Sequence, residues 1–221
     1  KDARHERGLW RRTTLEEYRK PDPQWETIID LDALNKAEGE NWVWHGADCL
    51  RPDYNRCLVA LSRGGADADV TREFDLANKT WIKDGFFRPE SKGGLNWVDR
   101  DTVFVYTDFG DGSMTTSGYP RIVKQWTRGT PIEQATVVYE GRPDDMYIAA
   151  YHDDTPGFER DFVSRIPSTI DRRSHALHLT TRGKAALAQF KRLAAEHERH
   201  VAEKIGKANR EQLLRILACF T

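Results

Sequence analysis

The 221-residue sequence has few cysteines and no long apolar run. Cys49, Cys57 and Cys219 are an odd number, too sparse for a disulfide framework, and no C-x-x-C spacing indicates a zinc site. We therefore expect reduced, structural thiols. The uncharged apolar runs are far shorter than the ~20 residues needed to cross a bilayer, and no export signal follows Lys1. These absences predict a soluble, cytoplasmic protein with no membrane partner.

The sequence also lacks an excess of charge of one sign, because 34 Lys and Arg face 35 Asp and Glu. This balance excludes a wholly basic nucleic-acid binder. The balance nevertheless differs along the chain: Ile170 to Thr221 holds 11 basic and 5 acidic residues, and six of the seven Trp precede Arg100. Two regions with different surfaces are indicated.

A repeated pattern of short strands occupies the first two thirds. Runs rich in β-branched and aromatic residues end in turn residues, and the run Asn55–Arg63 recurs about 46 residues later as Asp101–Asp108. The eight predicted strands are Asn41–Trp44, Asn55–Arg63, Val70–Leu76, Thr80–Lys83, Leu95–Val98, Asp101–Asp108, Arg121–Trp126 and Ala135–Tyr139. Four strands per ~45 residues is typical of a β-propeller blade. The sequence predicts a mainly β fold, an incomplete β-propeller of two to three four-stranded blades.

Ahead of these strands, Arg11–Pro21 has the pattern of a short helix stopped by its proline, and Gln24–Leu31 that of a strand.

Four segments, Gly8–Thr13, Pro23–Asp30, Leu58–Gly65 and Gly110–Arg121, resemble the propeller of bacterial prolyl oligopeptidases, and the resemblance extends to about Arg165. In that family a seven-bladed propeller caps an α/β-hydrolase domain and restricts access to short peptides. Cleavage is left to a Ser/Asp/His triad on the hydrolase. The resemblance therefore implies short peptides as partners, and we expect no cofactor.

No catalytic residue can be assigned. A nucleophile elbow needs G-x-S-x-G at a sharp strand-to-helix turn, and the sequence has none. Ser62 precedes Arg63 and Gly64, and Ser113 and Ser117 lie in a loop. We expect the chain by itself to be inactive, although its parent family consists of serine peptidases.

His45 and His152 could act as bases oriented by Asp153 or Asp154, but hydrogen-bonded structural roles are expected. The pairs Asp144-Asp145 and Asp153-Asp154 are interpreted as turn residues, with an acid–base or metal pair as the alternative. No metal site is predicted.

The tail, residues 166–221, is expected to be a small α+β segment. Ala176–Leu179 alternates like a strand, and Thr180 or Thr181 can cap a long amphipathic helix ending around Ile205-Gly206. Asn209 can cap a second, short helix. A packed helical hairpin is the simplest interpretation.

Within this tail, Asp171, Arg172 and Arg173, followed by Leu177–Gly183, resemble the wing and helix start of MarR-type winged-helix repressors. The resemblance implies DNA as a partner. Asp171 and Arg173 would form the wing pair at the minor groove, and Arg172 would contact phosphate. It also implies a homodimer through the C-terminal helices. The recognition helix that precedes the wing in that family is absent here, so little base readout is expected.

His197 and His200 lie one helical turn apart and could ligate a metal, but a solvated helix face is expected because a third ligand is lacking. The predicted division is a partial prolyl-oligopeptidase-like propeller at 1–165 and MarR-like wing and dimerisation helices at 166–221. Three functions remain open: part of a peptidase propeller, a DNA-binding regulator fragment, and a remnant or simple interaction module.

Overall fold

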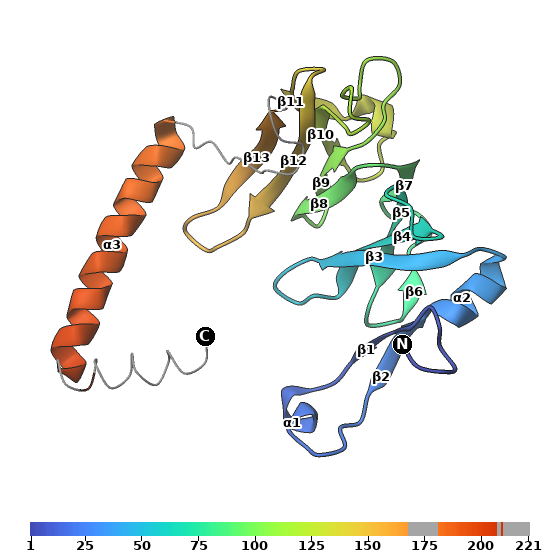
Figure 1. The fold of residues 1–221 in the computed structure, drawn as a ribbon, viewed down its shortest axis with the longest axis horizontal. Helices are drawn as coiled ribbons and strands as arrows, with labels where there is room; N and C mark the ends of the chain where they lie inside the picture. The colour runs from blue at the N-terminus through green and yellow to red at the C-terminus, as the bar shows by residue number, and fades with distance from the viewer. Residues whose placement is uncertain (168–180, 207–208, 210–221) are drawn as a thin grey trace. The chain divides into compact units, whose positions relative to one another are not determined.

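Antiparallel strands dominate the computed structural model, which describes residues 1–167, 181–206 and 209 (Figure 1). The strands are β1 (Leu9–Arg12), β2 (Glu26–Asp30), β3 (Trp42–Cys49), β4 (Arg56–Arg63), β5 (Asp69–Asp75), β6 (Thr80–Trp81), β7 (Phe87–Ser91), β8 (Gly94–Asp99), β9 (Thr102–Tyr106), β10 (Ile122–Thr127), β11 (Thr136–Glu140), β12 (Asp145–Asp153) and β13 (Arg160–Pro167). The helices are α1 (Leu15–Tyr18), α2 (Leu31–Glu38), the 3-10 turn η1 (Ile132–Gln134) and α3 (Thr181–Ile205).

The N-terminal region is a hairpin, β1 paired with β2. The helix predicted over Arg11–Pro21 is wrong at its start, because Arg11 and Arg12 continue β1. The helix is limited to α1, where the Thr14 hydroxyl accepts the Glu17 N–H at 3.1 Å. The strand predicted over Gln24–Leu31 is confirmed as β2.

Helix α2 was not predicted, although its capping residues are visible in the sequence. The Asp30 carboxylate accepts the N–H groups of Asp32 and Ala33, each at 3.0 Å, and so satisfies two donors at the helix start. Gly39 ends the helix with a φ of 68°, a left-handed conformation that glycine adopts without steric cost.

The first sheet has the order β3-β4-β5-β6, with β7 also paired to β5. The predicted strands are confirmed in position, but β3 continues to Cys49, five residues beyond the predicted end at Trp44. Strand β7 was missed because it contains Pro89, which is typical of sheet edges.

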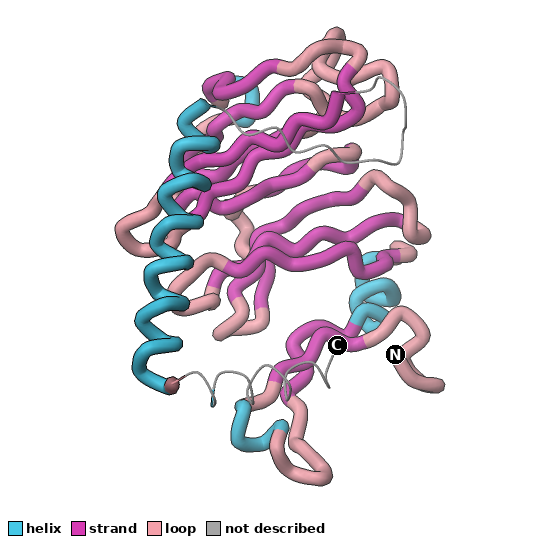
Figure 2. Tube along the Cα trace, turned by 60° about the vertical axis from the view of Figure 1, so that its left-hand side comes forward, coloured by secondary structure: helices cyan, strands magenta, loops and turns pink. Residues whose placement is uncertain are grey.

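The second sheet has the order β11-β10-β9-β8, and the third consists of β12 and β13. The three sheets come one after another along the chain, and their strands, drawn in magenta, make up most of the tube in Figure 2. A five-stranded sheet, a four-stranded sheet and a two-stranded part of a third confirm the predicted incomplete propeller.

Strand β9 shows how the sheets are held together, because its alternating side chains belong to two different cores. Val103 and Val105 pack in one apolar cluster with Leu58 and Phe86 of the first sheet's region. On the opposite face, Phe104 and Tyr106 pack with Ile148, Ala149 and Ala150 of β12. A strand buried on both faces thus stabilises two interfaces at once.

A buried ion pair adds a polar link between the first two sheets. Glu73 of β5 is only 1% exposed, and its carboxylate accepts the Arg128 guanidinium at 2.8 and 3.1 Å and the Phe86 N–H at 2.9 Å. Because Arg128 follows β10, this carboxylate joins β5 to the second sheet. Arg56 also lies 3.7 Å from this carboxylate, so two guanidinium groups compensate the buried charge.

Residues Leu177–Thr221 form a second compact unit, distinct from Lys1–Ala176. The predicted long helix is confirmed as α3. The predicted strand at 176–179, the wing residues Asp171, Arg172 and Arg173, and the helix after Asn209 lie outside the described residues. None of the described helices is both long and apolar enough to cross a membrane.

Candidate functional site

A cleft of about 360 Å³ opens where the first strands of the three sheets meet. β3 contacts β8, and β8 contacts β12, so three sheets contribute to one site. The lining residues are Asp48–Arg51 at the end of β3 and the turn after it, Asn96–Val98 of β8, and Tyr151–Asp154 at the end of β12. We call this site the central cleft.

Two side chains of β8 hold the walls of the central cleft together. Trp97 is 6% exposed, and its indole N–H donates to the Asp48 carbonyl at 3.0 Å. The Asn96 amide donates to the Ala150 carbonyl at 2.8 Å. β8 is thereby tied to β3 on one side and to β12 on the other.

The central cleft carries more negative than positive charge, because Asp48, Asp153 and Asp154 line it with Arg51 as the cation. Arg51 and Asp154 form an ion pair of 3.3 Å between the turn after β3 and the β12–β13 loop. Partial removal from water raises the pKa of the Asp48 carboxyl. The Trp97 N–H opposes this rise, and the Asp154 charge adds to it. A cationic group in the cleft would relieve this unfavourable charge.

The two histidines singled out in the sequence have carboxylate partners, as expected of structural residues. His45 Nδ1 lies 2.9 Å from Asp69, and His152 Nδ1 lies 2.8 Å from Asp161, the residue opposite it on β13. Asp153 and Asp154 therefore do not orient His152. His197 and His200 lie exposed on α3.

The serines singled out in the sequence do not meet these histidines. Ser62 is fully buried in β4, and its hydroxyl has no hydrogen-bond partner. The Ser113 hydroxyl bonds within its own loop, to Asp108 and the Gly110 carbonyl. The Ser117 hydroxyl donates to the Met146 carbonyl at 2.8 Å. The bonds of these serines give no nucleophile–base pair in the described part of the chain.

The carboxylates predicted to be turn residues serve two purposes. The Asp153 carboxylate accepts the N–H and hydroxyl of Thr155 at 3.0 and 2.6 Å, which confirms the turn role. Asp145 instead is 1% exposed at the start of β12 and pairs with Arg165 at 2.9 Å. Over residues 1–167, 181–206 and 209, no three His, Cys, Asp or Glu side chains come together as metal ligands would.

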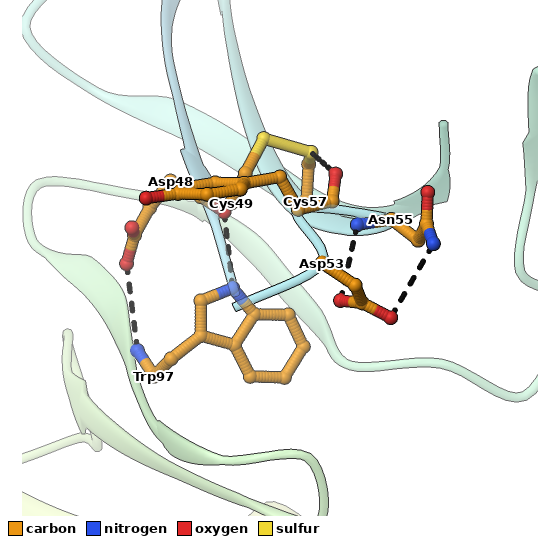
Figure 3. Close-up of a disulfide and its surroundings, with 7 residues drawn as sticks. Asp48, Cys49, Asp53, Asn55, Cys57 and Trp97 are labelled. Atoms are coloured by element: carbon orange, nitrogen blue, oxygen red, sulfur yellow. Dashed lines mark hydrogen bonds between the residues drawn. A yellow bond between two sulfur atoms is a disulfide. The ribbon is translucent and has the colours of Figure 1, made fainter. Parts of the chain in front are cut away.

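The prediction that all three cysteines are free thiols is wrong, because Cys49 and Cys57 form a disulfide (Figure 3). The antiparallel register places Cys49 of β3 directly opposite Cys57 of β4, with the Cα atoms 4.0 Å apart. Residues directly opposite each other in an antiparallel sheet come close enough for their sulfur atoms to bond. The prediction ended β3 at Trp44, so this pairing could not be anticipated.

The lining residues Asp48, Trp97 and Tyr151 were not singled out in the sequence either. The signal that could have identified them is their position within the repeats. Each lies on the first strand of a repeat, and in consecutive antiparallel sheets the equivalent strands lie side by side. Aligning the repeats with one another would have brought these positions together.

Consecutive antiparallel sheets, each packed face to face on the next, are typical of the blades of a β-propeller. The fold and the cleft at the first strands thus define this class of protein.

Within the class, the chain belongs to the prolyl oligopeptidase family. Residues 1–203 match the family model described as the prolyl oligopeptidase N-terminal β-propeller domain. The matched range runs beyond Arg165 and through most of α3. The MarR-type relationship suggested for the tail remains a prediction.

Two curated relatives are uncharacterized peptidases. The one from Sinorhizobium fredii is 49% identical over 145 residues, which cover 66% of this chain and 20% of the relative. The one from Rickettsia prowazekii is 35% identical over 157 residues, which cover 67% of this chain and 22% of the relative. A solved post-proline cleaving enzyme from Rickettsia typhi is 32% identical with a TM-score of 0.70, over 75% of this chain and 25% of that one. The chain thus spans about a quarter or less of the length of these relatives.

Proposed function

We propose that this chain is the part of a prolyl-oligopeptidase propeller that screens peptides, and that the central cleft contacts them. The observation that carries the proposal is the convergence of β3, β8 and β12 on one cleft. Aromatic side chains there, Trp97 and Tyr151, offer apolar contact, and surplus carboxylates favour a peptide's ammonium group. Relatives named as peptidases support peptides as the ligand class.

The test is peptide binding, measured by fluorescence anisotropy with a short proline-containing peptide that has a free amino terminus and a C-terminal fluorophore. Asp48→Asn should weaken binding by about two- to fivefold, the range of a partly exposed ion pair. The matched control is Asp144→Asn, the same change at an exposed residue outside the cleft. Equal affinities of the two variants, or unchanged affinity when the peptide's amino terminus is acetylated, would contradict the proposal.

We infer further that the chain does not hydrolyse peptides by itself. The hydrogen bonds of the candidate residues support this inference. His45 and His152 bind carboxylates, whereas the Ser113 and Ser117 hydroxyls bond to main-chain carbonyls. A fluorogenic proline-containing peptide should show no turnover above the rate in buffer. Turnover that a serine-directed reagent abolishes would refute the inference.

For the tail, we propose weak DNA association through Asp171, Arg172 and Arg173, with residues 166–221 acting as a unit that self-associates through its helices. The support is the wing resemblance and the local excess of basic residues. Binding to a labelled A·T-rich duplex should fall steeply between about 50 and 200 mM salt. Arg173→Ala should weaken binding more than Arg11→Ala in β1, and equal effects would count against the wing.

A further inference from the structure

The Cys49–Cys57 disulfide lies at the base of the β3–β4 turn, beside the central cleft (Figure 3). Its side chains pack with the apolar cluster on the face of the first sheet opposite Leu58. Cys49 is half-buried, whereas Cys57 is fully buried, so Cys49 is the less covered of the two cysteines. This asymmetry favours attack of a reductant on the Cys49 sulfur.

Besides the disulfide, main-chain hydrogen bonds hold the turn between the cysteines. All residues from Arg51 to Asn55 are exposed, so no buried side chain anchors the tip. The Leu50 N–H donates to the Arg56 carbonyl at 2.8 Å, and the Tyr54 N–H donates to the Leu50 carbonyl at 2.9 Å. The Leu76 N–H donates to the Asn55 carbonyl at 2.9 Å. The same turn carries Arg51, whose ion pair with Asp154 joins it to the β12–β13 loop. The disulfide therefore constrains a segment that reaches across the central cleft.

The reduced state also has a hydrogen-bond acceptor in place. The Cys57 sulfur lies 3.8 Å from the Tyr54 carbonyl oxygen. In the disulfide this sulfur has no hydrogen to donate, but a Cys57 thiol could donate its S–H to that oxygen. Reduction would thus leave the buried thiol with a polar partner, and both redox states suit the site.

We propose that Cys49–Cys57 is a redox-controlled latch that sets the mobility of the β3–β4 turn and so the opening of the central cleft. A thiolate of a dithiol reductant attacks the Cys49 sulfur, and Cys57 leaves as a thiolate that takes up a proton. The second thiol of the reductant then releases Cys49. The protein gains two electrons and two protons, and the dithiol becomes a disulfide. The proposal does not depend on peptide binding.

The test uses the full chain with Cys219→Ser, so that only the two latch sulfurs remain. Protein purified without reductant should yield a linked pair of tryptic peptides, 37–56 and 57–63, because the chain is not cleaved at Arg51 before Pro52. Native treatment with dithiothreitol should release the pair, so that both cysteines are alkylated once the reduced protein is denatured. Two free thiols before any treatment, or a bond that resists reduction until the protein unfolds, would overturn the proposal.

The structural consequence is read by hydrogen exchange. Reduction should speed exchange of the amides in residues 50–56 by about tenfold or more. Exchange in β9, which is buried on both faces, should stay unchanged. Cys49→Ser in the same background should reproduce the reduced pattern. Identical exchange of 50–56 in the oxidised and reduced protein would show that the disulfide is no latch, whatever the variant does.

Discussion

Asp145 shows how one buried carboxylate can stabilise a sheet of only two strands. It lies buried at the start of β12, pairs with Arg165 of β13 and accepts the Arg142 N–H at 2.7 Å. Burial alone would raise the pKa of this carboxyl, but the hydrogen bonds from Arg165 and Arg142 outweigh it and lower the pKa. The charged form is therefore the one that stabilises the third sheet.

Asp145→Asn should reduce the free energy of unfolding by about 2 kcal/mol at pH 7, the range for hydrogen bonds to a charged group. Because the folded-state pKa is lowered, this contribution is present above the ordinary aspartate value near 4 and is lost as the pH falls through the lowered pKa. Urea unfolding at pH 7 and near pH 3 should show the difference between wild type and variant shrinking. A difference that stays constant with pH would argue against this role.

At the scale of elements, the start of β8 depends on a close approach of two main chains. Gly93 has a φ of 137°, and a Cβ there would lie 2.0 Å from the Tyr106 carbonyl oxygen of β9. Main chain cannot move aside as a flexible side chain can. The link between β7 and β8 therefore requires glycine at this position.

Gly93→Ala should destabilise the protein by about 3 kcal/mol or more, because the β8–β9 pairing must shift. Gly129→Ala is the matched control. Gly129 also has a positive φ, 76°, but its Cβ would meet open space, so about 1 kcal/mol of backbone strain is expected. The melting temperatures of the two variants, each compared with wild type, separate the cost of the close contact at residue 93 from the cost of backbone strain alone. Equal losses would contradict the argument.

The elements also show what the sequence could and could not predict. Short runs of β-branched and aromatic residues located β4, β5, β9 and β10, because each strand packs at least one face in a core. Helix α2 was not predicted, although Asp30 and Gly39 are capping residues, because it has only eight residues between two strands. Strand β7 was missed because of Pro89.

The central cleft could not be predicted in the same way. Its lining comes from three repeats, and the cysteine pair depends on the register of β3 against β4. Register and packing between sheets are long-range properties that local patterns do not encode. The sequence did indicate correctly that His45 and His152 have hydrogen-bonded structural roles, but it did not identify their partners.

At the scale of the whole molecule, the third sheet presents an open edge. Within the described residues, β13 pairs only with β12, and Val163 on it is 41% exposed. Unpaired strand edges with apolar side chains favour association with another chain. We therefore expect concentration-dependent self-association.

Val163→Lys should reduce this association, because a charged side chain on an edge strand disfavours pairing. Gln125→Lys adds the same charge at an exposed position on β10, which is paired on both sides, and should leave association unchanged. Sedimentation velocity over a range of protein concentrations measures both. Association that is insensitive to Val163→Lys would place the contact elsewhere.

The two-faced burial of β9 has a thermodynamic consequence. If each sheet is stabilised mainly by its neighbours, the molecule behaves as a one-dimensional series of coupled units, in which each added sheet contributes one interface. Stability should then rise stepwise with the number of sheets rather than with chain length. Loss of the second sheet would uncouple the first from the third and divide unfolding into separate transitions.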